Sequence, residues 1–126
     1  MKIKVSELSG LALDWAVAKC EGKNGVFHND GITQCIVIEA PSGVYKGTWK
    51  PTINWAQSGP IIERDRITLM FDADGGTYSA HVAEFRQRGM SNRTRWRCGP
   101  TPLIAAMRCY VASKLGDETE IPKELL

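Results

Sequence analysis

The chain has 126 residues, of which 43% are hydrophobic and 24% are charged, and its formal net charge is +2. This length and composition predict one globular domain, residues 1–126, with an apolar core of its own. They exclude a membrane-spanning helix, which needs roughly 20 apolar residues in a row, and the small net charge does not favour a general polyanion binder. The N-terminus lacks the apolar stretch of a secretory signal, so we expect a cytoplasmic protein.

The first part of the chain predicts a strand, a helix and a second strand. Residues 2–5 alternate charged and apolar side chains, as an edge strand does. Residues 6–22 start with serines that can cap a helix, end at a glycine and carry apolar residues at helical spacing. Trp15 lies on that apolar face, so we expect it in the core. Residues 23–31 are rich in turn formers and predict a loop, whereas the β-branched residues 32–40 predict a buried strand.

An irregular stretch with two tryptophans, WKPTINWAQSGP (49–60), follows the second strand. It is too irregular for a strand and too aromatic for a simple linker, so we expect a shaped loop. In this interpretation Trp55 packs its ring against the sheet and holds the loop, while Trp49 is more exposed. The end of the stretch predicts a short helix over residues 58–64, with Ser58 as its cap and a proline in its first turn.

The second half of the chain predicts a hairpin, a basic loop and a helix. Two apolar stretches flank the turn DADGG, so residues 67–85 predict a β-hairpin. Residues 85–97 contain five arginines and no acid, which indicates an exposed loop. Residues 101–116 begin with Thr-Pro and end at a glycine, as a capped helix does, and we expect Arg108 and Lys114 to point into solvent.

Together these elements predict an α+β domain. A small antiparallel sheet of three to four strands would be layered with two main helices, because each apolar face must be covered by another element. The acidic residues near the C-terminus and the arginine-rich loop also polarise the charge along the chain.

The residue types that usually carry catalysis or bind metals are few. The four cysteines lack the close spacing of a zinc motif, and neither of the two histidines lies in a catalytic signature. Asp72 and Asp74 precede two glycines, but the other ligands of a calcium loop are missing, so they are better explained as turn residues. We therefore expect no metal, no cofactor and no disulfide, and a binding protein in preference to an enzyme.

Aromatic and basic side chains gather in the two irregular segments and predict a pocket between them. A nucleotide-like anion needs flat faces for its base, and cations or backbone donors for its phosphate. The candidate ligand-binding residues are Tyr45, Trp49, Lys50, Asn54, Trp55, Arg93, Arg95, Arg97 and Thr101. In this hypothesis Trp49 or Trp55 stacks on the base, an arginine pairs with the phosphate, and the helix start at Thr101 adds backbone donors.

Three stretches together resemble the NinX family of small lambdoid-phage proteins. They are LSGLALDWAVAKCEG, WAQSGPIIER and GPTPLIAAMRCYVASKLGDETEIP, and they span nearly the whole chain. Before the second stretch the family pattern resembles Tyr-Ser-Pro-Ser-Thr-Asp/Asn-Trp, which this chain matches at Pro51, Asn54 and Trp55. The resemblance implies an α-β-α sandwich and a non-essential accessory protein in the cytoplasm of the host cell.

The residues and the resemblance leave three functions open. The first is sequestration of a small anionic nucleotide-like ligand, such as a host immune signal, as a phage counter-defence. The second is a protein–protein adaptor or an inhibitor of a host protein, because Trp and Arg are enriched at interface hot spots. The third is an accessory factor in phage DNA recombination, which the arginines fit better than the net charge of +2 does.

Overall fold

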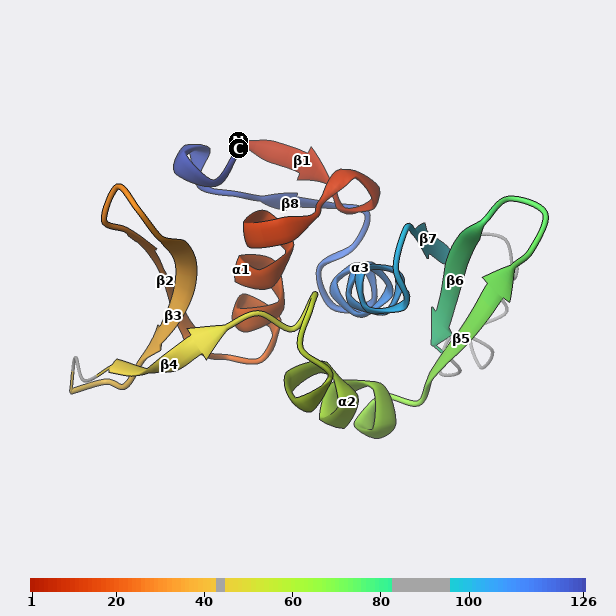
Figure 1. Ribbon diagram of the computed structural model, residues 1–126, viewed down its shortest axis with the longest axis horizontal. Coiled ribbons are helices and arrows are strands. Elements are labelled where there is room, and N and C mark those ends of the chain that lie inside the picture. The colour runs from red at the N-terminus through yellow and green to blue at the C-terminus, as the bar shows by residue number, and fades with distance from the viewer. Residues whose placement is uncertain (43–44, 83–95) are drawn as a thin grey trace.

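Two helices that pack against each other lie at the centre of the fold. The computed structural model of the chain describes residues 1–42, 45–82 and 96–126. The central pair is α1 (Gly10–Cys20) and α3 (Pro102–Leu115), and α2 (Trp55–Arg64) lies below them in Figure 1, in contact with α3. The predicted α+β class is confirmed.

The described strands form three small antiparallel sheets. The sheet beside α1 contains, in spatial order, β2 (Asn24–Asn29), β3 (Gln34–Glu39) and β4 (Tyr45–Trp49). The sheet beside α3 contains β5 (Ile67–Asp72), β6 (Thr77–Val82) and β7 (Arg97–Gly99). The third sheet joins the two ends of the chain by pairing β1 (Lys2–Lys4) with β8 (Glu118–Glu120).

The layers run from a sheet through two helices to a second sheet (Figure 1). The sequence predicts one sheet, and the observed order follows from how apolar the two helices are. In α1 the residues Ala16, Val17 and Ala18 are all buried, so successive faces of the helix need cover. Two glycines let the sheets lie close to the helices. A Cβ on Gly25 would lie 3.0 Å from the Cβ of Ala18 on α1, and a Cβ on Gly99 would lie 2.8 Å from the backbone N of Ala105 on α3.

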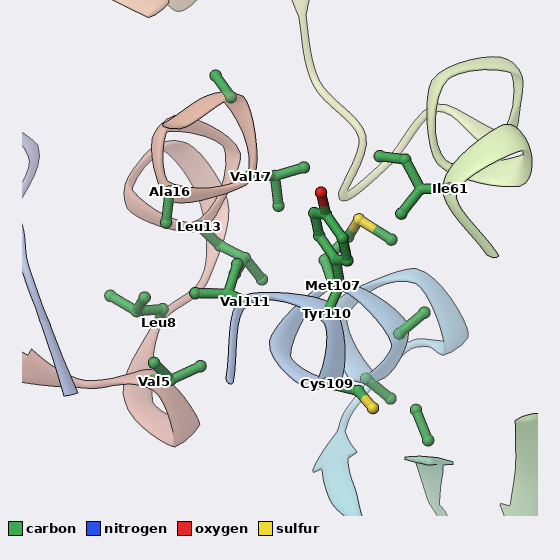
Figure 2. Packing of buried hydrophobic residues seen from close by; sticks show 14 of the residues in the cluster. Val5, Leu8, Leu13, Ala16, Val17, Ile61, Met107, Cys109, Tyr110 and Val111 are labelled. Carbon is green, nitrogen blue, oxygen red and sulfur yellow. The ribbon is translucent and has the colours of Figure 1, made fainter. Parts of the chain in front are cut away.

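The core fills the space between the three helices. Figure 2 shows the Tyr110 ring of α3 between Val17 of α1 and Ile61 of α2, with Met107 beside it. Leu8 and Val111 continue this cluster toward the N-terminus. The buried ring of Tyr110 therefore links all three helices.

Several predicted elements are confirmed. The strand expected over residues 32–40 is β3, the hairpin is formed by β5 and β6, and the capped helix over residues 101–116 is α3. The strand expected over residues 2–5 is β1. Residues 83–85, the last of the predicted hairpin, lie outside the described residues.

Strands β2 and β4 and the start of α2 differ from the prediction, and β7 and β8 were not predicted. Residues 24–29 form β2 in place of a loop, because every one of them pairs with β3 despite its turn-like composition. Strand β4 precedes the irregular stretch and ends at its first residue, Trp49. Helix α2 begins at Trp55 and not at Ser58, because the side chain of Asn54 accepts a hydrogen bond from the backbone N of Ala56 and caps it.

Two basic residues of α3 differ from each other. Lys114 is exposed, as expected. Arg108 is half-buried, and its guanidinium donates hydrogen bonds to the carbonyl oxygens of Leu8 (2.7 Å) and Cys98 (2.8 Å). The expectation that Arg108 lies free in solvent was wrong. One of these carbonyls lies in the turn before α1 and the other on the edge strand β7, and both need a hydrogen-bond donor. Trp15, expected in the core, packs against it with its ring partly exposed.

Candidate functional site

Side-chain hydrogen bonds from neighbouring elements hold the Trp49–Trp55 segment, which links β4 to α2. Gln57 donates from Nε2 to the carbonyl of Thr48 (2.8 Å) and accepts from the backbone N of Lys50 (2.7 Å). The backbone N of Thr52 donates to the carboxylate of Asp14 on α1 (3.0 Å). These bonds fix the segment at both its start and its middle, so contacts within the chain set its shape.

The two tryptophans of this segment have opposite environments, and the predicted assignment was the reverse. Trp49 is 8% exposed, because it pairs with Ile36 across β3 and β4 on the face that packs toward α1. Trp55 is 55% exposed as the first residue of α2, and Ile53 beside it is 72% exposed. The period of two along β4 decides which face Trp49 takes. Trp55 is therefore the tryptophan available for contact.

A buried carboxylate lies under the segment. Asp14 is 3% exposed, and burial raises its pKa to about 6, although hydrogen bonds from Thr52 act to lower it. Thr52 and Pro51, which lie over it, are also buried. Asp14 therefore anchors the middle of the segment at some electrostatic cost, since a charged group loses solvation when it is buried.

The other predicted site residues play several roles. Lys50 is exposed, and Asn54 and Thr101 are helix caps: Thr101 accepts from the backbone N of Ile104 (3.2 Å). The backbone of Tyr45 starts β4 opposite Glu39. Two predicted residues, Arg93 and Arg95, lie outside the described residues.

Arg97 lines a hollow of about 690 Å³ at the free edge of β7, which we call the β7 hollow. The other residues that line it are Lys4, Ser6, Trp96, Cys98, Arg108, Asp117 and Glu118. The Trp96 ring stacks on the buried ring of His81, with centroids 4.8 Å apart. Arg97 pairs with Asp117 at 2.6 Å, and Arg108 is bound to carbonyls, so both guanidinium groups of this hollow already have partners.

The predicted pocket joined the tryptophan and arginine segments, and the structure places their described residues in separate hollows. Trp49 lines a hollow of about 270 Å³ with Lys23 and Gln57, whereas Arg97 lines the β7 hollow. The β4 end and α2 lie on the lower side of the molecule in Figure 1, and β1 and β8, near Arg97, lie on the upper side.

Trp15, Lys19 and Lys23 form a group that the sequence patterns above did not indicate. Trp15 and Lys19 lie one helical turn apart on α1, and the Lys19 ammonium is 5.6 Å from the centre of the Trp15 ring. Lys23 follows four residues later, with its ammonium 5.4 Å from the centre of the Trp49 ring. The i, i+4 spacing of Trp15 and Lys19 was the available signal.

A polar cluster joins the C-terminal ends of α1 and α2 to α3. Arg64 donates two hydrogen bonds to the carboxylate of Glu21 (2.7 and 3.1 Å), which also accepts from the Tyr110 hydroxyl. Partial burial acts to raise the pKa of Glu21, but the bonds from Arg64 and Tyr110 lower it below its ordinary value. All three side chains satisfy one another, so the cluster serves the packing of the helices.

The fold and these surfaces define a class: a small α+β protein with two central helices and open, shallow hollows. No three metal-ligating side chains gather in the described ranges, and no described helix is long and apolar enough to cross a membrane. Residues 4–114 match the family described as Bacteriophage P22, NinX, and the chain belongs to that family. The predicted resemblance is thereby confirmed. A search of curated proteins found no match.

Proposed function

We propose that this phage protein is an accessory protein that acts by binding a host protein through Ile53 and Trp55. The proposal rests on one observation: two large apolar side chains are 72% and 55% exposed on a segment that is already ordered. Isolated exposed apolar residues are common, but these two lie two positions apart, next to a helix cap. Trp is also the residue type most enriched at interface hot spots.

Order in the free protein favours such a contact. Lys50, Thr52 and Asn54 are each tied by a hydrogen bond, so little backbone entropy is lost when a partner binds. The contacting side chains do not contribute to the core, so binding can use them without loss of stability. A partner with an apolar groove wide enough for an indole ring fits this surface, and inhibition of a host defence protein would be one use of it.

The test compares Trp55→Ser and Ile53→Ser with Ile32→Ser. Ile32 is 94% exposed at the turn between β2 and β3, so Ile32→Ser makes the same substitution as Ile53→Ser on a remote surface. A host protein captured by the wild type is identified, purified and titrated by calorimetry. We expect the first two variants to weaken binding by about 2 kcal/mol or more, about thirtyfold, and Ile32→Ser to bind normally. Equal binding by all variants would overturn the proposal.

A second candidate function is retention of a nucleotide-like anion in the β7 hollow. The Trp96 ring stacks on His81, which fixes its orientation, and Arg97 lines the same hollow. An oriented ring beside a guanidinium group supports the binding of a stacked base with its phosphate next to it. Asp117 pairs with Arg97 and would compete with that phosphate. Asp117→Asn should therefore tighten the binding of cyclic and linear nucleotides in calorimetry, and Arg97→Gln should weaken it. If neither variant changes affinity, the hollow has no such role.

A further inference from the structure

Two lysines, at the C-terminal end of α1 and just after it, differ from the guanidinium groups of the β7 hollow. Lys19 and Lys23 are exposed, and among the described residues neither forms an ion pair within 4.0 Å. The acids on which they act electrostatically are engaged elsewhere, because Glu21 pairs with Arg64 and Glu120 pairs with the N-terminal ammonium. The positive charge of these lysines is therefore available to a ligand.

Each lysine lies over an indole ring, and the two arrangements adjoin. Trp15, Lys19, Lys23 and Asn24 line one hollow of about 360 Å³, and Lys23 also lines the hollow beside Trp49. We call the surface formed by Trp15, Lys19, Lys23, Asn24 and Trp49 the lysine–tryptophan surface. It runs from the end of α1 across the start of β2 to the end of β4.

The chemistry of this surface matches a phosphate attached to a nucleobase. The partly exposed indole of Trp15 offers a flat apolar face on which a base can stack. The two ammonium groups lie at the surface and are held there only weakly by their contact with a ring. They can therefore move to a phosphate, where the hydrogen bond is charge-assisted and stronger. The amide of Asn24 can donate to and accept from the edge of a base.

We propose that the lysine–tryptophan surface binds a nucleotide phosphate through Lys19 and Lys23 while a base stacks on Trp15. Trp49 is 8% exposed, so it contacts the Lys23 ammonium but is too buried for a base to stack on it. The ligand is a free nucleotide or one unit of a single strand, since both present the same base and phosphate. This site does not depend on Ile53 or Trp55.

The experiment uses the full chain and two probes, adenosine monophosphate in calorimetry and a fluorescein-labelled oligothymidylate in anisotropy. The double variant Lys19→Gln/Lys23→Gln should weaken binding by about tenfold or more for each ammonium–phosphate hydrogen bond that it removes. For the oligonucleotide, the slope of log affinity against log salt should fall by about 0.7 for each phosphate that is no longer neutralised. Binding of both probes indicates a single strand as well as a nucleotide, and binding of the monophosphate alone restricts the ligand to free nucleotides.

A matched control separates this site from general attraction to positive charge. Lys2→Gln/Lys123→Gln removes the same charge from exposed positions at the two ends of the chain and should leave affinity within about twofold at moderate salt. Trp15→Leu should weaken both probes further than this control does, because it removes the stacking face. All the lysines changed are exposed, so these variants should fold.

Two results would overturn the proposal. One is no binding of either probe by the wild type at low salt. The other is an equal loss of affinity in the Lys19→Gln/Lys23→Gln and Lys2→Gln/Lys123→Gln variants. Trp55→Ser should bind both probes like the wild type, so the failure of either proposal leaves the other standing.

Discussion

The two ends of the Trp49–Trp55 segment carry the same residue type in opposite environments. Trp49 closes the sheet beside α1 and is 8% exposed, whereas Trp55 starts α2 and is 55% exposed. Between them Pro51 and Thr52 are buried over Asp14, and Ile53 turns outward. One short segment thus has an anchoring end, the buried Trp49, and a presenting end, the exposed Trp55. We expect substitutions at the anchoring end to change stability and substitutions at the presenting end to change binding.

The largest effect is expected at the anchoring end. Trp49→Ala should lower the free energy of unfolding by about 3–5 kcal/mol, because it removes a large buried ring and leaves a cavity. Urea denaturation followed by far-ultraviolet circular dichroism measures this. Trp49→Phe keeps a ring and removes the indole N–H, which has no hydrogen-bond partner among the described residues, so its loss should be clearly smaller. If Trp49→Ala left the free energy of unfolding nearly unchanged, Trp49 would not anchor the segment and the two ends would not differ.

The next effect concerns Asp14 and depends on pH. Its pKa is about 6 in the folded chain against an ordinary value of 3.8, so the folded state binds the proton more tightly than the unfolded state does. The stability that this proton contributes is complete below about pH 4 and is lost as pH rises through about 6. A shift of about two units corresponds to about 3 kcal/mol, as an order of magnitude.

Asp14→Asn provides the measurement, because an asparagine still offers Thr52 an oxygen and does not titrate. The free energy of unfolding of the wild type minus that of the variant should fall between pH 4.5 and pH 7.5 by about 2 kcal/mol, since the rest of the effect lies below pH 4.5. Taking the difference cancels the carboxylates that titrate in both proteins. Parallel pH profiles would mean that burial does not raise the pKa of Asp14.

A smaller effect is expected at the cap between the two ends. Asn54→Ala removes the side-chain oxygen that accepts from the backbone N of Ala56, and it should cost about 1 kcal/mol. Asn54→Asp keeps the acceptor and should cost little. Thermal unfolding of the three proteins compares them directly. If Asn54→Asp is as damaging as Asn54→Ala, the cap does not position the start of α2.

The smallest effect on stability is expected at the presenting end. Trp55→Ala should change the free energy of unfolding by no more than about 0.5 kcal/mol, since an exposed side chain adds little to the core. The same urea titration as for Trp49→Ala measures it. A loss comparable to that of Trp49→Ala would show that Trp55 packs against the fold and is not free for a partner.

Local patterns in the sequence were sufficient to determine several elements. The hairpin of β5 and β6 follows from two apolar stretches around a glycine-rich turn, and α3 follows from Thr101, a proline and a closing glycine. The family also followed from stretches spread along the chain. The signals for the hairpin and the helix each lie within a few neighbouring residues, and neighbouring residues determine turns and caps.

Tertiary contacts alone decided the arrangement of layers and the candidate sites. Strand β2 exists because it pairs with β3, and the two outer sheets are separate because α1 and α3 pack against each other between them. The burial of Trp49 depends on its partner Ile36, and the position of Lys23 over the Trp49 ring joins residues 26 positions apart. Residue spacing cannot supply such contacts, because long-range packing outweighs the small energies of local preference.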